Sequence, residues 1–383
     1  MHTLTLYFSY GQMLLNWDVL TEILSFLDRA NASRMSRTCR TLHQAPLVPR
    51  ILLDYEVTLW SPKQLVSFCR YILPGSRRAR FQYFLRLNLR ISGRRFNINT
   101  PQLGELLAAI FARSTKLEWL SLSNCALLEI DERIPPSLLS LTKLRTLVLN
   151  ELTERTGDIL KHIPAALTSI SMDAMKLDDE LELNAIPMFA HFKDSLETLG
   201  VTWADFIGED VLYTRVTNLS VGHCYFPELR PIIRCFPNLR DLHIDIGDAP
   251  TTLEEQVEAH RLLNLASQPQ TSWTSFSRLS GSLHTLYMLG IQCTAEYLNV
   301  IEPLDSTSND LRLGVVLSDV RPTTLRMVLR MPEFDISRLA HVLSAARDTV
   351  KGLILDLEFY GEEYKGPTPQ IVSPAVVRVT LDC

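Results

Sequence analysis

One phrase, Leu-x-x-Leu-x-Leu, recurs through most of this 383-residue chain, with Ile, Val or Met often in place of Leu. The clearest copies begin at Leu117, Leu144, Leu167, Leu196, Val216, Leu239 and Leu283, and weaker ones begin at Phe84, Thr324, Val350 and Val376. The second and third apolar residues of a copy alternate with other residues, as in a strand with one buried face. Because one copy cannot bury its own strand face, neighbouring copies must stack into a continuous core. The pattern therefore predicts a curved parallel sheet with one strand in each repeat; a generic α/β domain with leucine-containing strands is the alternative.

The spacing of the copies is that of leucine-rich repeats. The first six clear copies begin 20 to 29 residues apart, inside or close to the usual range. The interval between Leu239 and Leu283 is longer and predicts an insertion. There, Thr251–Glu255 has the pattern of a capping box at the start of a helix that runs toward Leu265. We therefore expect the α/β fold class, with residues 55–383 forming an irregular leucine-rich-repeat solenoid.

Residues 15–42 predict a pair of short amphipathic helices. Four apolar residues of the first helix share one face and are expected to form the core of the hairpin, namely Leu20, Ile23, Leu24 and Leu27. Val19 and Phe26 widen this face beyond what one neighbouring helix can cover. The second helix is expected to be capped by Asn31. Because a unit of about forty residues is near the lower limit for burying a core alone, the spare apolar surface predicts a partner.

The amino-acid sequence of the hairpin is similar to that of a known domain. The hairpin resembles the F-box in the string Leu15-Asn16-Trp17-Asp18-Val19-Leu20-Thr21-Glu22-Ile23-Leu24-Ser25-Phe26-Leu27-Asp28 and in the later string Arg37-Thr38-Cys39-Arg40-Thr41-Leu42. The resemblance implies that residues 14–54 form a helical unit that docks on the Skp-type adaptor of a cullin-RING ubiquitin ligase. Asn16 is a departure, because it stands where the family usually has the Pro of its Leu-Pro opening.

The same resemblance implies which residues contact the adaptor. The adaptor-binding candidates are Leu15, Asn16, Val19, Leu20, Ile23, Leu24, Phe26 and Leu27. Among them, we expect Leu15, Val19 and Phe26 to form the edge that faces the adaptor.

An F-box followed by divergent leucine-rich repeats resembles a large set of fungal F-box domain-containing proteins. This combination implies a substrate receptor of a ubiquitin ligase complex, which acts in the ubiquitin conjugation pathway through protein–protein interaction. The solenoid would bind a protein target, and other subunits would carry out the catalysis. The alternative is a non-ligase interaction scaffold with a degenerate F-box, and Asn16 is the sequence feature that favours it.

The residues that flank the second and third apolar positions of each copy are expected to point outward from the concave face of the sheet. They would form the recognition surface for the target. The candidates for target binding are Arg86, Arg90, Trp119, Asp173, Asp241, His243, Asp245, Tyr287 and Arg326. We expect this surface to be basic at both ends and acidic near the middle.

The segment from Arg70 to Arg95 holds eight arginines and no acidic residue. Guanidinium groups bind phosphate through paired hydrogen bonds, so one hypothesis is that this segment receives an acidic or phosphorylated part of the target. The alternative is a solvated cap over the first repeat, in which arginine stems cover apolar surface. Interleaved aromatic residues also suit nucleic acid, but the negative chain and the lack of a recognised RNA or DNA module argue against that partner.

Composition excludes several classes of protein. A net charge of −5 gives no general attraction to nucleic acid or to anionic membranes. The seven cysteines are scattered without a Cys-x-x-Cys pair, which is typical of reduced thiols in an intracellular protein of the cytoplasm or nucleus. No run of eighteen apolar residues occurs, and residues 1–15 lack the features of a secretory signal. We therefore expect no membrane partner.

The sequence lacks the common catalytic motifs, including a phosphate-binding glycine loop, a His-Glu-x-x-His helix and a Gly-x-Ser-x-Gly elbow. His223, Cys224 and Cys235 have no spacing typical of a zinc site. Asp241, His243 and Asp245 lie on one side of a predicted strand and could hold a cation or exchange protons, but such a trio is more often a polar binding face. We expect a protein with no catalytic residues, no metal site and no cofactor.

Overall fold

The computed structural model describes the chain in a series of ranges, which are 17–38, 53, 56–73, 78–91, 101–174, 183–208, 210–223, 228–246, 254–268, 273–304, 307–331, 343–344, 346–359 and 376–382. Packing divides the chain into two compact units. The first unit comprises Met1–Ser121 and Ile130–Leu144, and the second comprises Leu122–Glu129 and Arg145–Cys383. The boundary at residue 55 that the sequence suggests between an F-box and a solenoid stays a prediction.

The first unit begins with the helical hairpin, which consists of α1 (Trp17–Phe26) and α2 (Arg29–Ser36). Asp28 caps α2, because its carboxylate accepts a hydrogen bond from the backbone N–H of Asn31 at 2.8 Å. The prediction that Asn31 is the cap is therefore wrong. Asp28 already combines extended backbone with an acceptor side chain, so the helix begins after it.

The rest of the first unit alternates strands with helices. Its elements are β1 (Val57–Leu59), α5 (Pro62–Ile72), the 3-10 helix η1 (Arg78–Tyr83), β2 (Arg86–Leu89), α6 (Pro101–Arg113), most of β3 (Trp119–Leu122) and α7 (Ile134–Leu138). β1 and β2 pair in parallel, with Val57 beside Leu87 and Leu59 beside Leu89. All four of these side chains are buried, so the weak copy that begins at Phe84 does contain a strand with an apolar face.

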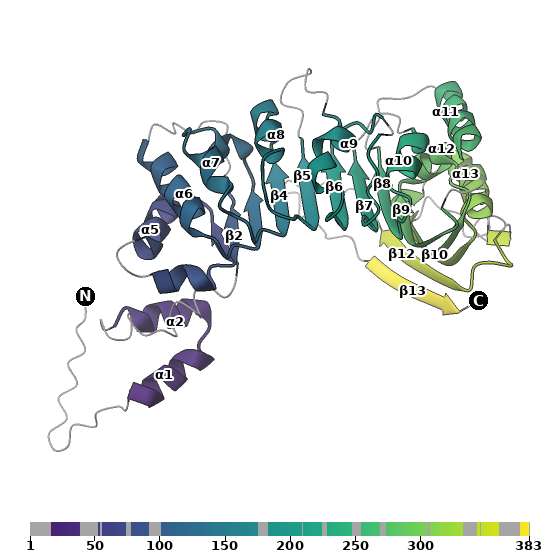
Figure 1. Cartoon of the computed structure of the whole chain (residues 1–383). Helices are drawn as coiled ribbons and strands as arrows, with labels where there is room; N and C mark the ends of the chain where they lie inside the picture. The colour runs from purple at the N-terminus through teal and green to yellow at the C-terminus, as the bar shows by residue number, and fades with distance from the viewer. Residues whose placement is uncertain are drawn as a thin grey trace, which may run out of the picture. The chain divides into compact units, whose positions relative to one another are not determined.

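The second unit contains a long sheet whose strands follow one another in sequence order (Figure 1). The strands are β4 (Thr146–Asn150), β5 (Ser169–Asp173), β6 (Thr198–Thr202), β7 (Asn218–Gly222), β8 (Asp241–Asp245), β9 (Ser275–Gly281), β10 (Thr294–Leu304), β11 (Pro322–Met331), β12 (Gly352–Phe359) and β13 (Val376–Asp382). Each neighbouring pair from β4 to β12 is parallel. β13 runs antiparallel to β12, so the prediction of a wholly parallel sheet is wrong at this last strand.

Helical segments connect these strands. They are η2 (Cys125–Leu128), α8 (Glu154–Leu160), α9 (Ala185–Met188), η3 (Ala190–Phe192), α10 (Leu229–Cys235), α11 (Glu254–Ser267), α12 (Leu283–Leu289) and α13 (Thr307–Val320). Hydroxyl side chains cap two of them, since Thr153 accepts from the N–H of Thr156 before α8 and Ser282 accepts from the N–H of Thr285 before α12. Each cap satisfies a backbone donor that would otherwise lack a partner at the start of the helix.

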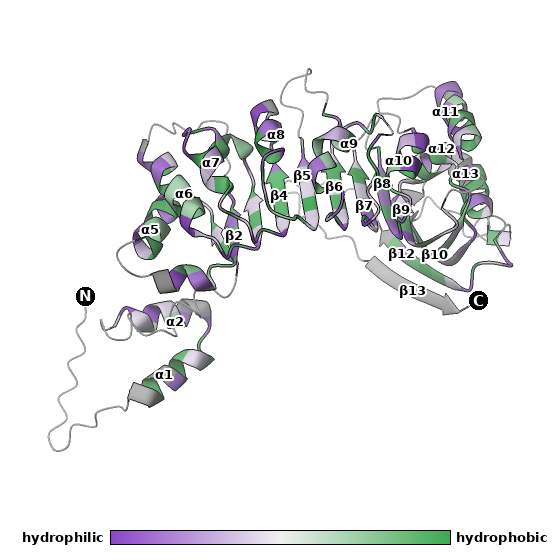
Figure 2. Ribbon diagram, in the orientation of Figure 1, coloured by the Kyte–Doolittle hydropathy of each residue, from purple (hydrophilic) through white to green (hydrophobic). Residues whose placement is uncertain are grey.

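The apolar phrase explains why the parallel strands align. The second apolar residue of successive copies forms one continuous buried row, in which Leu147, Ile170, Leu199, Leu219 and Leu242 are register partners. Burying a side chain of this size stabilises a fold by roughly 1.5–3 kcal/mol. Figure 2 shows the resulting alternation of green, hydrophobic residues with paler or purple ones along these strands. The sequence thus predicted the positions of β4 to β8 because their buried faces repeat in one phase.

The copy that begins at Leu283 is not a strand. Leu283, Leu286 and Leu289 are buried along α12, because a spacing of three residues also fits one face of a helix. Gly290 ends the helix in a left-handed conformation with φ of 56°. The strand before it is β9, where Phe276 supplies part of the buried face.

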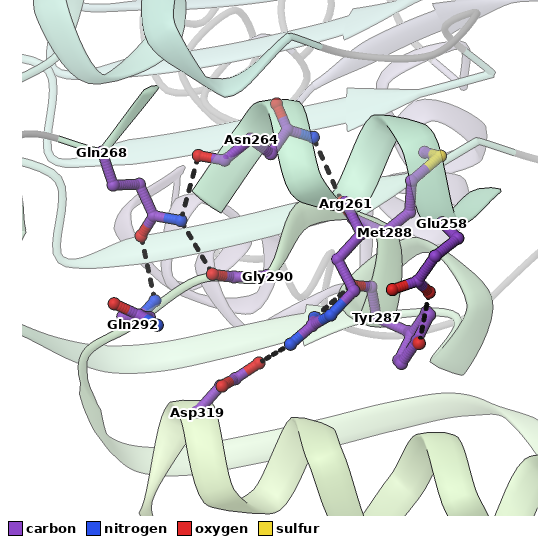
Figure 3. A network of polar contacts seen from close by, with 9 residues as sticks. All are labelled: Glu258, Arg261, Asn264, Gln268, Tyr287, Met288, Gly290, Gln292 and Asp319. Atoms are coloured by element: carbon purple, nitrogen blue, oxygen red, sulfur yellow. Dashed lines mark hydrogen bonds and ion pairs between the residues drawn. The ribbon is translucent and has the colours of Figure 1, made fainter. Parts of the chain in front are cut away.

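The insertion predicted between the copies at Leu239 and Leu283 includes the helix α11, as its capping-box pattern indicates. A polar network joins α11 to α12 and α13 (Figure 3). Arg261 donates to the backbone oxygen of Tyr287 and to Asp319, both at 2.6 Å. Asn264 of α11 donates to the backbone oxygen of Met288 at 3.2 Å. These contacts fix the insertion against the two later helices.

Candidate adaptor-binding and target-binding surfaces

The inner face of α1 carries part of the predicted hairpin core. Leu24 is fully buried, and Leu20 and Leu27 are half-buried. The three residues are four and three positions apart, which places them on one face of a helix at ~100° per residue. This face holds the helix against its surroundings, and the neighbouring face, about 100° around the helix, is left exposed.

The neighbouring face of α1 is apolar and exposed. Val19, Ile23 and Phe26 are 42%, 41% and 81% exposed, and their spacing of four and three residues again defines one face. The prediction that Ile23 belongs to the hairpin core is therefore wrong, because Ile23 is exposed at the edge of the face that it shares with Val19 and Phe26. Leu15 and Asn16, the other two adaptor-binding candidates, lie outside the described residues. The three side chains together expose an apolar strip along α1.

A groove of about 560 Å³ lies on the exposed face of the sheet in the second unit. Ser171, Gly200 and Ser220 are register partners on β5, β6 and β7 and form its floor of small residues. His243 of β8 continues this row, and Asp241 also lines the groove. Two of the predicted target-binding residues thus meet in one groove.

Hydrogen bonds hold the polar side chains of this groove. His243 Nδ1 lies 2.9 Å from the hydroxyl of Ser280 on β9. In the orientation that satisfies both atoms of its amide, Asn218 donates to Asp241 Oδ2 at 2.9 Å. Arg278 of β9 also lines the groove, so its wall carries both signs of charge.

A second group of side chains lies where β5, β6 and β7 end. Asp173 is the last residue of β5, and Trp203 and His223 directly follow β6 and β7. The rings of Trp203 and His223 stack with centroids 4.7 Å apart and planes 5° apart. Burial raises the pKa of Asp173, and the nearby His223 opposes that shift. The sequence marked Asp173, but no pattern marked Trp203, whose position depends on the backbone after the strand.

The first unit carries the described part of the arginine-rich segment. Arg86 is exposed on β2, and Arg90, which directly follows β2, is exposed with its guanidinium 4.8 Å from the ring centroid of Trp60. Arg80 is only 4% exposed and donates to the backbone oxygen of Tyr71. Arg80 is therefore not part of an exposed basic surface, because its guanidinium is buried against Tyr71 within the first unit. Its guanidinium also lies 4.1 Å from the Tyr71 ring centroid.

Of the other arginines in this segment, only Arg70 has a described side chain. Arg70 is exposed on α5, and Trp119 is half-buried on β3. The side chains of Arg77, Arg78, Arg94 and Arg95 lie outside the described residues. Within the described residues, the hypothesis of a phosphate-binding surface therefore depends on Arg70, Arg86 and Arg90.

Arg326, on one of the late strands that we predicted to be basic, forms an ion pair with Asp356. Its Nε and Nη2 lie 2.7 and 2.6 Å from Asp356 Oδ2, and Asp356 is buried on β12. This hydrogen-bonded partner raises the pKa of Arg326. Arg326 stays a predicted target-binding residue, with its charge paired to Asp356.

Tyr287 does not lie on the sheet. It belongs to α12, where its hydroxyl donates to Glu258 Oε2 of α11 at 2.7 Å. Tyr287 is therefore removed from the group of candidates on the concave face, because its copy of the phrase is helical.

Asp245 lies on β8 and is half-buried at the carboxyl end of that strand. Its backbone oxygen accepts from the N–H of His223 at 2.6 Å. Cys235 is buried, and Cys224 lies outside the described residues. Across the described part of the chain, no three His, Cys, Asp or Glu side chains gather closely enough to hold a metal ion.

Comparison with known families identifies an F-box domain at residues 13–51. The match includes α1 and α2, and hence the exposed face formed by Val19, Ile23 and Phe26. A comparison with curated proteins gives no match. Within the described ranges, no helix has the length and apolar character needed to cross a membrane.

Proposed function

We propose that this protein is the substrate-recognition subunit of a Skp-cullin-F-box type ubiquitin ligase. The observation that carries the proposal is the F-box domain at residues 13–51, whose first helix exposes Val19, Ile23 and Phe26. An apolar helix face suits docking into a hydrophobic groove of a partner. The Skp-type adaptor would cover this face and connect the chain to the cullin and its RING subunit.

The second unit would act as a leucine-rich-repeat solenoid that holds a protein target. Support comes from its parallel strands in sequence order and from the groove on their exposed face. The chain itself would make or break no covalent bond. By holding the target near the ubiquitin carrier, it would raise the effective concentration of a target lysine.

Co-purification tests this function. The chain with Val19→Glu and Phe26→Glu should lose a tagged Skp-type adaptor, because two buried charges at a docking face would be desolvated. The matched control is Leu139→Glu with Leu262→Glu, which changes two exposed apolar residues outside the hairpin. The control should retain the adaptor. Retention by the hairpin variant would show that this face of α1 is not the docking surface.

The alternative is an interaction scaffold with a degenerate F-box. Asn16, which replaces the usual Pro of the family, is the observation that favours it. The same purification separates the two functions, because a ligase subunit recovers both adaptor and cullin. A scaffold recovers the adaptor alone or neither protein.

A further inference from the structure

We propose that Asp173, Trp203 and His223 form a subsite that binds an arginine side chain of the target. The inference rests on the proposed role of the sheet in target binding, and it specifies the chemistry of one position in the target. The three residues lie together where β5, β6 and β7 end. They lie next to the groove, because Thr202, which lines the groove, directly precedes Trp203.

The backbone holds the two rings in an unusual conformation. Trp203 and His223 have φ values of 62° and 50°, in the left-handed region that bulky residues rarely adopt. For a residue with a Cβ, this conformation brings the Cβ too close to the following carbonyl oxygen. Hydrogen bonds from the Trp203 N–H to Gly222 O at 3.0 Å and from the His223 N–H to Asp245 O at 2.6 Å hold the backbone there. Such conformations persist where surrounding contacts fix them, and they gather at binding sites.

The aromatic pair provides a surface that suits a planar cation. The Trp203 and His223 rings are nearly parallel, with planes 5° apart. Trp203 is half-buried and His223 is exposed, so the pair reaches the protein surface. A guanidinium group stacks on aromatic rings and is attracted to their faces, most strongly to that of tryptophan.

Asp173 supplies the complementary charge. Its Oδ1 is buried and accepts no hydrogen bond from the described residues. A buried acceptor without a donor is unfavourable, and burial also raises the pKa of this carboxyl. Because a guanidinium carries several N–H donors in one plane, it can donate to a carboxylate while stacking on a ring. An anionic ligand would be repelled by the same carboxylate.

Peptide selection tests the subsite with the full chain. The probe is a library of twelve-residue peptides with random flanks and Arg, Gln or Glu at one central position. The unmodified chain should retain Arg peptides at least five-fold more than Gln peptides, and Glu peptides least. Asp173→Asn and Trp203→Leu should each abolish the preference, whereas Trp203→Phe should keep it because an aromatic ring remains.

Two controls make the result decisive. Asp158→Asn removes an exposed carboxylate of α8 that pairs with Lys161, and it should keep the preference. Adaptor co-purification, measured on every variant, reports the proposed function separately. Equal retention of Arg and Gln peptides, or an Arg preference that survives both Asp173→Asn and Trp203→Leu, would overturn the subsite even where the adaptor is recovered.

Discussion

Arg261 and Asp319 form a largely buried ion pair, with Nη2 and Oδ2 2.6 Å apart, and this pair connects α11 with α13. Arg261 also lies 4.6 Å from the ring centroid of Tyr287 and donates to its backbone oxygen. The Arg261 guanidinium therefore makes an ion pair with a carboxylate, a hydrogen bond to a backbone carbonyl and a cation–π contact with an aromatic ring. Through these contacts, α11, which lies in the insertion predicted from the spacing of the repeats, packs against α12 and α13 of the second unit.

Arg261→Ala should strongly destabilise the second unit, because it leaves Asp319 buried without its partner. The expected loss in free energy of unfolding is about 3–5 kcal/mol, measured by denaturant unfolding. Arg215→Ala is the matched control, because Arg215 pairs with Glu197 at the same 2.6 Å but with both side chains exposed. The control should lose less than about 1 kcal/mol. Equal losses in the two variants would mean that burial of the Arg261 pair has no special effect.

Two glycine substitutions should have opposite effects on stability. A Cβ at Gly281 of β9 would collide with the backbone oxygen of Ile244 on the neighbouring strand, so Gly281→Ala should lower the melting temperature. A Cβ at Gly314 of α13 would meet no atom within 4 Å. Gly314→Ala should stabilise the protein by roughly 0.5–1 kcal/mol, because alanine favours the helical backbone. Thermal melts that move in the same direction would contradict this prediction.

Three buried thiols should resist alkylation in the folded protein. Burial raises the pKa of Cys69, Cys125 and Cys293 to about 12. Since the thiolate is the reactive form, alkylation at pH 8 should be about 1000-fold slower than for an exposed thiol. Iodoacetamide labelling followed by peptide mapping measures this directly. Full labelling of these residues before unfolding would contradict the described burial.

The stability of the protein should depend on pH through Asp173. Because burial raises its pKa above the ordinary value of 3.8, the folded protein binds this proton more tightly than the unfolded chain does. The resulting stability is full below about pH 3.8 and is lost as the pH rises through the raised pKa. Asp173→Asn should therefore raise the melting temperature at neutral pH, by an amount that shrinks toward pH 4. A lower melting temperature at neutral pH would mean that the charged carboxylate is stabilised in the fold.

The sequence predicted the strands better than the residues that shape the surface. Strands β4 to β8 follow from the apolar phrase because alternate burial has a period of two. The phrase failed at Leu283, where the same spacing of three residues fits a helix and Ser282 supplies a cap. The stacking of Trp203 on His223 could not be predicted, because it depends on left-handed backbone at two residues without a local signal.

Charge was also harder to predict than fold. Arg80 and Arg326 looked available in the sequence, yet the first contacts Tyr71 and the second contacts Asp356. Both partners are distant enough in sequence that only the packed structure brings them together. Among the described arginines of the basic segment, Arg70, Arg86 and Arg90 are exposed.

The most direct measurement is the mass of the complex formed by the purified full chain, a Skp-type adaptor and a cullin–RING pair, determined by light scattering after size exclusion. We predict a single species that contains one copy of each protein. The same chain without residues 14–54 should elute apart from the adaptor and the cullin. Separate elution of the full chain would contradict its role as a ligase subunit.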